Sequence, residues 1–298
     1  MFDIVTVGSN VIDLFLETNV HETKNKMCYE VGAKLLITNL KQDWGGGGTN
    51  TAVAFSRLGL KTAYIGKTGN DSNGNKILEL LKKEKAKFLG TRGGQTGLSV
   101  ILDSKEHDRT ILTYKGVNDD LRFSEIKPPN TKWLYYSSML GDSFKTQIKL
   151  AKLLRKKYTK LAINPSSYQT EKGSRYLQPL LDLASIIILN KEEAEMLTNK
   201  KDLLKGLYNL GPKIVCITDK DKPVLAFDGR RKYKLTPNKK VKAIERTGAG
   251  DAFASGFVAG LIKTNDINFA LKLGSKNSES VITQFGAKNN LLYWKDVK

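Results

Sequence analysis

The chain has 298 residues, of which 40% are hydrophobic and 27% charged, a composition that allows a large buried core and excludes a disordered chain. No uninterrupted apolar run approaches the roughly 18 residues of a membrane-spanning helix, so no membrane partner is expected. The two cysteines stand far apart and give neither a disulfide framework nor a metal-ligand spacing. The start of the chain resembles a strand rather than a cationic leader, which predicts a cytoplasmic protein.

The net charge of +19 comes from 49 Lys and Arg residues against 30 Asp and Glu residues. A balance of this size can indicate a nucleic-acid partner. The excess is mostly lysine spread along the chain, however, whereas base recognition and phosphate clamps favour the planar fork of arginine. We interpret the charge as a solvated lysine surface that attracts anionic nucleotides, and expect no specific nucleic-acid partner. A non-catalytic nucleic-acid or metabolite-binding protein stays as an alternative.

Predicted strands and helices alternate along most of the chain. The strands are expected at residues 2–8, 61–66, 133–137, 161–164 and 186–189, with a hairpin at 214–218 and 224–227. The helices are expected at residues 51–58, 72–85, 143–157, 176–183, 192–198 and 252–263. Near-continuous apolar strands indicate a sheet that is covered on both faces. The pattern therefore predicts an α/β fold with a doubly wound, mostly parallel central sheet, which binds ligands at the carboxyl ends of its strands.

Four further extended segments interrupt this alternation, because no helix follows them. They span residues 11–17, 34–38, 98–102 and 109–114. We expect them to form a small antiparallel sheet set apart from the main body. Residues 1–298 would then be a single α/β domain, in which residues of about 11–40 and 96–115 contribute the small sheet.

Two glycine clusters open predicted helices. Residues 247–251 read Thr-Gly-Ala-Gly-Asp, and residues 45–50 read Gly-Gly-Gly-Gly-Thr-Asn. Glycines at a helix start leave backbone N–H groups open to an anion, which the helix dipole also attracts. A carboxylate beside such an anion pocket, here Asp251, suits a group that moves a proton while the N–H groups hold a phosphoryl group. The alternative is a turn followed by an ordinary helix cap.

With these motifs the chain resembles the ribokinase-like (PfkB) family of carbohydrate and nucleoside kinases. The matching segments are residues 45–50, 66–74, 190–193 and 247–251, which occur in the order that the family has, across nearly the whole chain. The resemblance implies that the small sheet is a lid over a sugar site. It implies an ATP-dependent kinase that transfers the γ-phosphate to a sugar hydroxyl. A nucleoside kinase of the same fold is the alternative, and Lys34 and Arg109 leave a phosphosugar kinase open.

The resemblance also assigns site residues. Asp251 would be the general base, and the backbone N–H groups of Gly248, Ala249 and Gly250 would form the anion hole. The residues expected to bind the acceptor are Asp13, Gly46, Gly47, Asn50 and Asn164. The residues expected around the nucleotide are Asn190, Thr218, Lys220, Thr247, Gly248, Gly250 and Asn277.

Asn190 and Glu193 lie three residues apart at a predicted helix start. Their oxygen atoms are ligands that suit Mg²⁺, and the resemblance implies a metal role. A helix cap made by the same pair is the alternative.

One segment departs from the family pattern. Glu245-Arg246-Thr247 stands where most relatives carry Asp-Thr-Thr or a near variant, and where some relatives hold a monovalent cation. The longer glutamate and the fixed charge of Arg246 speak against activation by K⁺. An exposed edge of the lid sheet would allow two chains to pair, so a homodimer is a further expectation.

Overall fold

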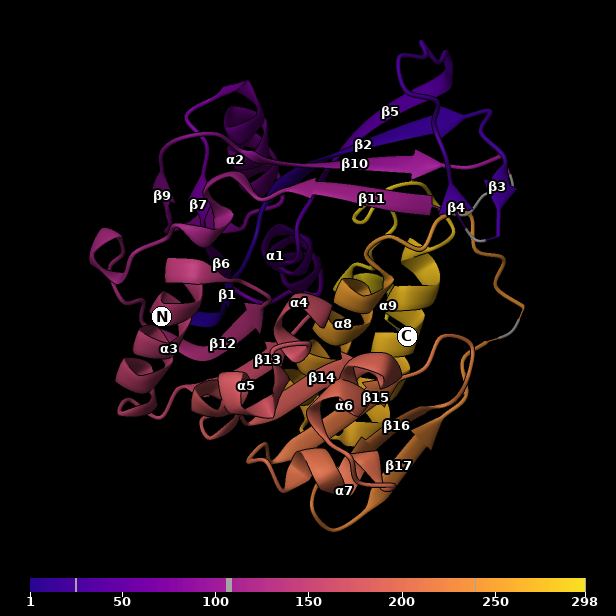
Figure 1. The fold of residues 1–298 in the computed structure, drawn as a ribbon. Coiled ribbons are helices and arrows are strands. Elements are labelled where there is room, and N and C mark those ends of the chain that lie inside the picture. The colour runs from indigo at the N-terminus through magenta and orange to yellow at the C-terminus, as the bar shows by residue number, and fades with distance from the viewer. Residues whose placement is uncertain (25, 106–108, 239, 298) are drawn as a thin grey trace.

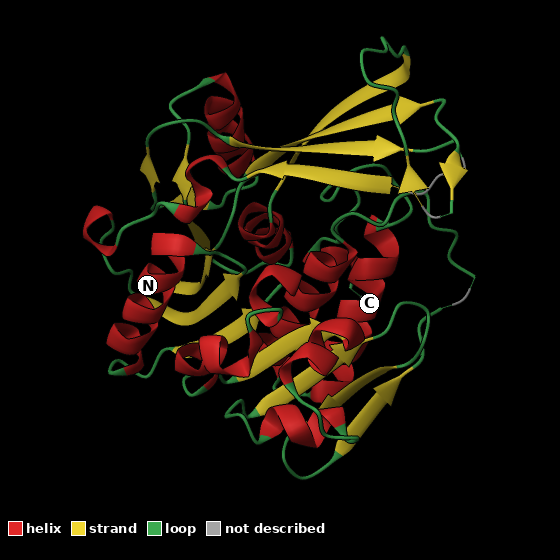
Figure 2. Cartoon of the chain, in the orientation of Figure 1, coloured by secondary structure: helices red, strands yellow, loops and turns green. Residues whose placement is uncertain are grey.

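The computed structural model describes residues 1–24, 26–105, 109–238 and 240–297. In this part of the chain a nine-stranded sheet forms the body, and a separate four-stranded sheet lies across one side of it (Figure 1). Figure 2 shows helices on both sides of the large sheet and none on the outer side of the small one. The predicted doubly wound, mostly parallel fold with a small second sheet is confirmed.

The large sheet is parallel except at one end. Its strands, in spatial order, are β17 (Lys232–Leu235), β16 (Val224–Phe227), β15 (Ile214–Thr218), β14 (Ile186–Asn190), β13 (Lys160–Asn164), β12 (Thr131–Ser137), β1 (Phe2–Val7), β6 (Thr62–Ile65) and β8 (Lys87–Phe88). Neighbours from β15 to β8 run parallel. Strands β15, β16 and β17 form an antiparallel meander, which confirms the predicted hairpin and adds a strand that was not predicted.

Helices cover the two faces of this sheet. They are α1 (Gly47–Arg57), α2 (Ser72–Lys83), α3 (Gly141–Arg155), α4 (Ser167–Thr170), α5 (Gly173–Leu181), α6 (Lys191–Leu197), α7 (Leu203–Tyr208), α8 (Ala249–Thr264) and α9 (Ile267–Val281). Helices α3, α5, α6 and α7 pack on one face, and α1, α8 and α9 pack on the other. No helix within the described ranges is long and apolar enough to cross a membrane.

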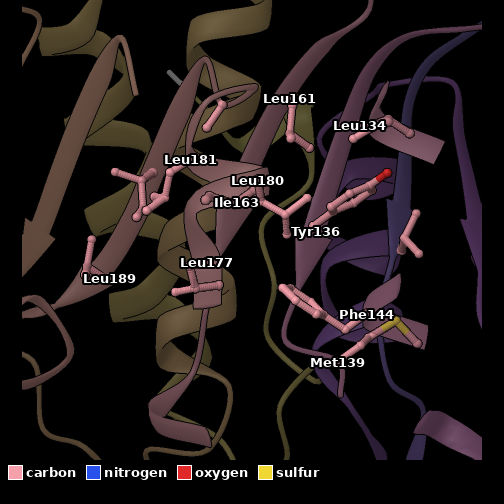
Figure 3. Packing of buried hydrophobic residues seen from close by; sticks show 14 of the residues in the cluster. Leu134, Tyr136, Met139, Phe144, Leu161, Ile163, Leu177, Leu180, Leu181 and Leu189 are labelled. Atoms are coloured by element: carbon pink, nitrogen blue, oxygen red, sulfur yellow. The ribbon is translucent and has the colours of Figure 1, made fainter. Parts of the chain in front are cut away.

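Alternating side chains of the central strands feed two hydrophobic layers. In β14, Ile187 and Leu189 join the layer under α5 and α6, whereas Ile186 and Ile188 join the layer under α8 and α9. Figure 3 shows the first layer, where leucines of α5 meet side chains of β12 and β13. Each large apolar side chain buried in this way contributes about 1.5–3 kcal/mol. The layers hold the carboxyl ends of β12 to β15 at one edge of the body.

The lid sheet has the strand order β11 (Arg109–Tyr114), β10 (Gly97–Asp103), β2 (Val11–Thr18) and β5 (Ile37–Gly45). The expectation that all its strands are antiparallel is wrong for one pair, because β2 and β10 run parallel. Both strands leave the body in the same direction, since β2 follows β1 directly and β10 follows the short strand β9 (Thr91–Arg92). Two other short strands, β3 (Glu22–Thr23) and β4 (Lys26–Met27), pair with each other, and β7 (Lys67–Thr68) pairs with β9.

The boundaries of two lid strands matter for the site. The strand expected at 34–38 overlaps β5 only at its end, because β5 begins at Ile37, extends to Gly45 and leads directly into α1. Asp13 lies inside β2, as the extended segment expected at 11–17 implies, and opposite Asp43 of β5. The two carboxylates are therefore neighbours in the lid, next to the glycine cluster.

Candidate active site

The two glycine motifs meet between the lid and the body. Asn50 lies in the first turn of α1, whose N-cap is Gly46. Its side-chain nitrogen donates a hydrogen bond of 2.8 Å to Oδ2 of Asp251, in the first turn of α8. The same Asn50 keeps its Oδ1 buried and without a hydrogen-bond partner among the residues described. A buried polar atom of this kind indicates a place for a polar ligand.

The start of α8 is shaped by its glycines. Gly248 is the N-cap with φ of 80°, and a Cβ there would lie 2.5 Å from Cβ of Ala287. A Cβ on Gly250 would meet no atom within 4 Å, so this residue faces open space. In the described chain the N–H of Gly250 donates to no backbone carbonyl, whereas that of Ala249 donates to the Arg246 carbonyl at 3.2 Å. Ala249 would have to give up this bond to join the predicted anion hole.

Asp251 is a half-buried carboxylate in the first turn of α8. Burial raises its pKa, while the hydrogen bond from Asn50 and the charge of Lys288 act in the opposite direction. A carboxylate with a raised pKa is a stronger base, and Asn50 fixes its orientation. Next to a helix start that is open to an anion, it can accept a proton from a hydroxyl while negative charge gathers on the neighbouring group.

Asp251 opens into a cavity of about 370 Å³ at the carboxyl ends of the parallel strands. Ser137, Asn164, Asn190 and Thr218 end four adjacent strands, β12 to β15, and all line this cavity. Asn164 is already engaged, since it accepts from the Tyr135 hydroxyl at 3.2 Å and donates to the Ile188 carbonyl at 2.8 Å. This position is where a doubly wound sheet binds its ligands.

A second cavity, of about 490 Å³, shares Thr218 and Gly250 with the first. Its walls include Val224, Phe253 and Ile282, and such apolar walls suit a flat aromatic ring. The two cavities meet at the start of α8. An extended ligand with an aromatic end and an anionic end could therefore occupy both.

Asn190 and Glu193 form a helix cap, which was one of the two roles predicted for them. Asn190 Oδ1 accepts from the Glu193 N–H at 2.8 Å, and Glu193 Oε2 accepts from the Asn190 N–H at 3.0 Å. Glu193 also lines the first cavity, where burial and the charges of Glu192 and Asp251 raise its pKa to about 7. A carboxylate whose charge is poorly solvated favours a nearby cation, so the residues present fit Mg²⁺. The metal role itself stays a prediction.

The predicted residues fall into three groups. Those that line the first cavity are Gly47, Asn164, Asn190, Glu193, Thr218, Gly248, Gly250 and Asp251. Those that line the second are Thr218, Lys220, Ala249 and Gly250. Those outside both linings are Asp13, Gly46, Asn50, Thr247 and Asn277. Of the last group, Asn50 contacts Asp251 directly, and Thr247 donates its N–H and hydroxyl to Glu245 at 2.8 Å.

Asn277 was expected near the nucleotide; its own side chain lies outside both cavities, while Ser275 and Ser278 of the same helix line the second one. The side chain is fully buried between helices, donating to the Ala252 carbonyl at 2.8 Å and accepting from the Leu292 N–H at 3.0 Å. Both ends of the amide are therefore used to join α8 to the C-terminal segment. Lys220 lies at the second cavity, but its ammonium pairs with Glu192 at 3.2 Å on the surface.

Sequence reasoning missed several residues of the site. Lys115 lines the first cavity with its ammonium 4.1 Å from the ring centre of Tyr168, which lines it too. Asp43 and Lys288 lie beside Asp13, and burial raises the pKa of Asp13 to about 6. No local pattern marked these residues, because each takes its role from a distant segment. Lys34 is exposed, and the side chain of Arg109 falls outside what the structure describes.

A base and an anion site at one helix end are what phosphoryl transfer to a hydroxyl requires, so the fold and the site together define a kinase. Comparison with known proteins gives the family. Residues 1–293 match the model of the pfkB family carbohydrate kinases, and the chain belongs to this family. The expected family, kinase class and hydroxyl-directed phosphotransferase activity are confirmed.

Relatives with different acceptors resemble the chain over most of its length. It is 33% identical to a cytidine kinase of Thermococcus kodakarensis over 81% of this chain and 88% of that protein. It is 28% identical to a ribokinase of Haemophilus influenzae over 87% of this chain and 88% of that protein. The solved structure of a nucleoside kinase of Methanocaldococcus jannaschii aligns with the whole of this chain over 97% of its own length. The TM-score is 0.84 and the sequence identity is 21%, so this similarity concerns the fold alone.

Proposed function

We propose that this kinase uses Mg-ATP to phosphorylate a hydroxyl group of a sugar, with Asp251 as the general base. The observation that carries the proposal is the hydrogen bond between Asn50 and Asp251, which joins the glycine cluster under the lid to the start of α8. It puts a polyol-binding amide and a base within reach of one acceptor hydroxyl. Asp251 directly follows Gly250, whose N–H is open to an anion.

The residues divide the work as follows. Asp251 takes the proton of the acceptor hydroxyl as its oxygen attacks the γ-phosphorus and the bond to the β-phosphate oxygen breaks, releasing ADP. The N–H groups of Gly248 and Gly250 stabilise the negative charge on the transferring group. Asn190 and Glu193 would hold Mg²⁺, which neutralises phosphate charge when bound. The apolar second cavity would take the nucleotide base, with Thr218 and Lys220 near the phosphates.

On the acceptor side, the proposal assigns Asp13, Gly46, Gly47 and Asn50 to the polyol. A buried carboxylate that faces the acceptor can accept two hydroxyl protons. Asn50 Oδ1 and, at the first cavity, Ser137 Oγ are buried polar atoms that have no hydrogen-bond partner in the described part of the chain. A ligand with several hydroxyl groups would satisfy these atoms.

A nucleoside kinase is the second candidate, which the 33% identity to a cytidine kinase favours. The test for both is ADP production with Mg-ATP against pentoses, hexoses, keto-deoxy sugar acids and nucleosides, with Asp251→Asn alongside. Turnover of one sugar that the variant loses would establish the first candidate, and preference for a nucleoside would establish the second. Background hydrolysis alone with every acceptor, unchanged in the variant, would contradict both.

Two further properties belong to this proposal. Glu245 accepts the N–H and hydroxyl of Thr247, and Arg246 adds a positive charge, so we expect equal turnover in potassium and sodium buffers. The lid carries exposed apolar residues on both edge strands, including Leu40 (58% exposed) and Leu112 (56%), which suits a homodimer through the lid. Sedimentation equilibrium tests that state. An ATP-consuming enzyme is expected in the cytoplasm, where ATP is supplied.

A further inference from the structure

Lys288 is an unusual lysine. It follows α9 in the C-terminal loop and is 3% exposed, and within the described ranges it and Asp13 are the only Lys, Arg, Asp or Glu side chains in the buried class. Lysine is almost never fully buried unless it is paired, because burying an ammonium is costly. The other lysines that the structure describes are not buried in this way, so the burial of Lys288 needs a specific explanation.

The ammonium of Lys288 lies where the lid meets the body. It donates a hydrogen bond to the carbonyl of Trp44, the residue before the glycine cluster. Three carboxylates are close enough for their charge to raise its pKa, although none forms an ion pair with it in the described chain: Asp13 of β2 and Asp43 of β5 in the lid, and Asp251 of α8 in the body. Asp43 Oδ2 is buried and has no hydrogen-bond partner in the described chain. The charge of Lys288 thus acts on carboxylates of both parts.

The backbone of this loop is held separately from the ammonium. Arg57 donates a hydrogen bond of 2.7 Å to the carbonyl of Lys288 and forms an ion pair of 2.6 Å with Glu84. Loss of the ammonium alone would therefore leave the main chain anchored. The loop and the charge can be tested as two different features.

We propose that Lys288 is a positioning residue of the phosphotransfer reaction, whose positive charge keeps Asp13 ionised toward the acceptor and couples the lid to Asp251. This inference rests on the proposed function. Among the described residues Lys288 is the one cation whose charge lowers the pKa of Asp13 and of Asp251, so its removal leaves these two carboxylates without a positive neighbour. The least costly response is protonation of a carboxylate, and a protonated Asp13 loses an acceptor site for substrate hydroxyls.

Titration of neighbouring groups supports this account. The charge of Lys288 lowers the pKa of both Asp13 and Asp251, in opposition to burial. The other charged groups that act here are Asp43 and Glu245, which raise the pKa of Asp13, and Arg57, which lowers the pKa of Lys288. Burial lowers the pKa of Lys288 overall, and the charges of the three carboxylates oppose this shift. Removing the ammonium must therefore move the titration of Asp13 and Asp251 to higher pH.

The test is Lys288→Met in the full chain, which keeps an unbranched side chain and removes the charge. With the acceptor found by the substrate panel, we expect kcat/KM to fall about tenfold through KM, and its acid limb to move up by about one pH unit. ATP affinity measured by calorimetry should stay unchanged. Lys272→Met is the matched control, because Lys272 is an exposed lysine on α9 and its loss changes the net charge equally. Unchanged KM and acid limb, or an equal loss of ATP affinity, would overturn the proposal.

A double-variant comparison isolates the pair. If Lys288 acts through Asp13, Lys288→Met should cost less in an Asp13→Asn background than in the native chain. Additive losses would show that the two residues act separately.

A second measurement does not depend on turnover. Thermal unfolding of the native chain and Lys288→Met is compared at pH 5 and pH 8. Asp13 is mostly protonated at pH 5 and ionised at pH 8, so the loss of Tm should be larger at pH 8. An equal decrease in Tm at both pH values would show that Lys288 does not stabilise the ionised form of Asp13. If no acceptor is phosphorylated, the proposed function fails, and this measurement still decides the role of Lys288.

Discussion

The two ends of the proposed active site differ in the groups that form them. The phosphoryl end is mainly backbone, since the Gly248–Asp251 segment presents N–H groups at the start of one helix. The acceptor end consists of side chains from β2, β5, α1 and the C-terminal loop. A backbone site needs one short segment with the right glycines, whereas a side-chain site needs several distant segments to fold around each other. A backbone site can therefore be recognised from a short motif in the sequence, whereas a site made of distant side chains cannot.

Asp251→Asn gives the largest expected effect, because Asp251 belongs to both ends. The asparagine can still accept the hydrogen bond from Asn50 but takes no proton, so kcat should fall by roughly 10²–10⁴. Affinity for ATP, measured by calorimetry, should change little. A variant that keeps more than a tenth of native kcat would show that the base lies elsewhere.

Asp13→Asn probes the acceptor end. Because the pKa of Asp13 is raised to about 6, the carboxylate is ionised above that pH and neutral below it. We therefore expect the acceptor KM of the native enzyme to rise as pH falls from 7 to 5. The variant should have a KM higher by about tenfold or more at pH 7.5 and should lose this pH dependence. An acceptor KM that is independent of pH in the native enzyme would contradict this role.

The effect of Asp13 on the pH dependence of folding stability also has a definite sign, which Asp13→Asn can test. The pKa of Asp13 is higher in the folded state than its usual value of 3.8, so the folded chain binds more protons between about pH 4 and 6. Its contribution to folding stability consequently falls as pH rises through that window. Relative to the native chain, Asp13→Asn should lack this decrease in urea unfolding measured at pH 4.5 and 7.

Glu193→Gln tests the metal prediction at the phosphoryl end. Glutamine keeps an oxygen that can accept from the Asn190 N–H, so α6 stays capped. Loss of the carboxylate should raise the Mg²⁺ concentration for half-maximal turnover by about tenfold. Since the pKa of Glu193 is raised to about 7, the native enzyme should also need more Mg²⁺ at pH 6 than at pH 8. Native Mg²⁺ dependence in the variant would leave Glu193 as a helix cap alone.

The contrast between local and distant segments explains which parts of the fold and of the proposed site could be predicted from the sequence. The alternation of strands and helices and the motif at 247–251 predicted the sheet and Asp251, because both depend on local periodicity and one helix end. The parallel pairing of β2 with β10 was missed, because it depends on how two segments leave the body. Lys288 was missed because its partner Trp44 lies 244 positions away, in a chain with 49 Lys and Arg residues. The sequence also did not show that the amide of Asn277 links α9 to α8 and to the C-terminal segment, because such a contact depends on tertiary packing.

The smallest effect on turnover is expected from a pair of glycine variants that separates fold from chemistry within the phosphoryl end. Gly248→Ala places a Cβ at a left-handed residue and against Ala287, so it should cost at least about 1–2 kcal/mol of folding stability. Gly250→Ala adds a Cβ that meets no atom of the protein within 4 Å, so Tm should hold. That methyl group instead lies at the helix start where the phosphoryl group is expected, and kcat should fall by about tenfold. Equal losses of Tm in the two variants would mean that Gly250 is needed for the fold, and a backbone anion site would lose its support.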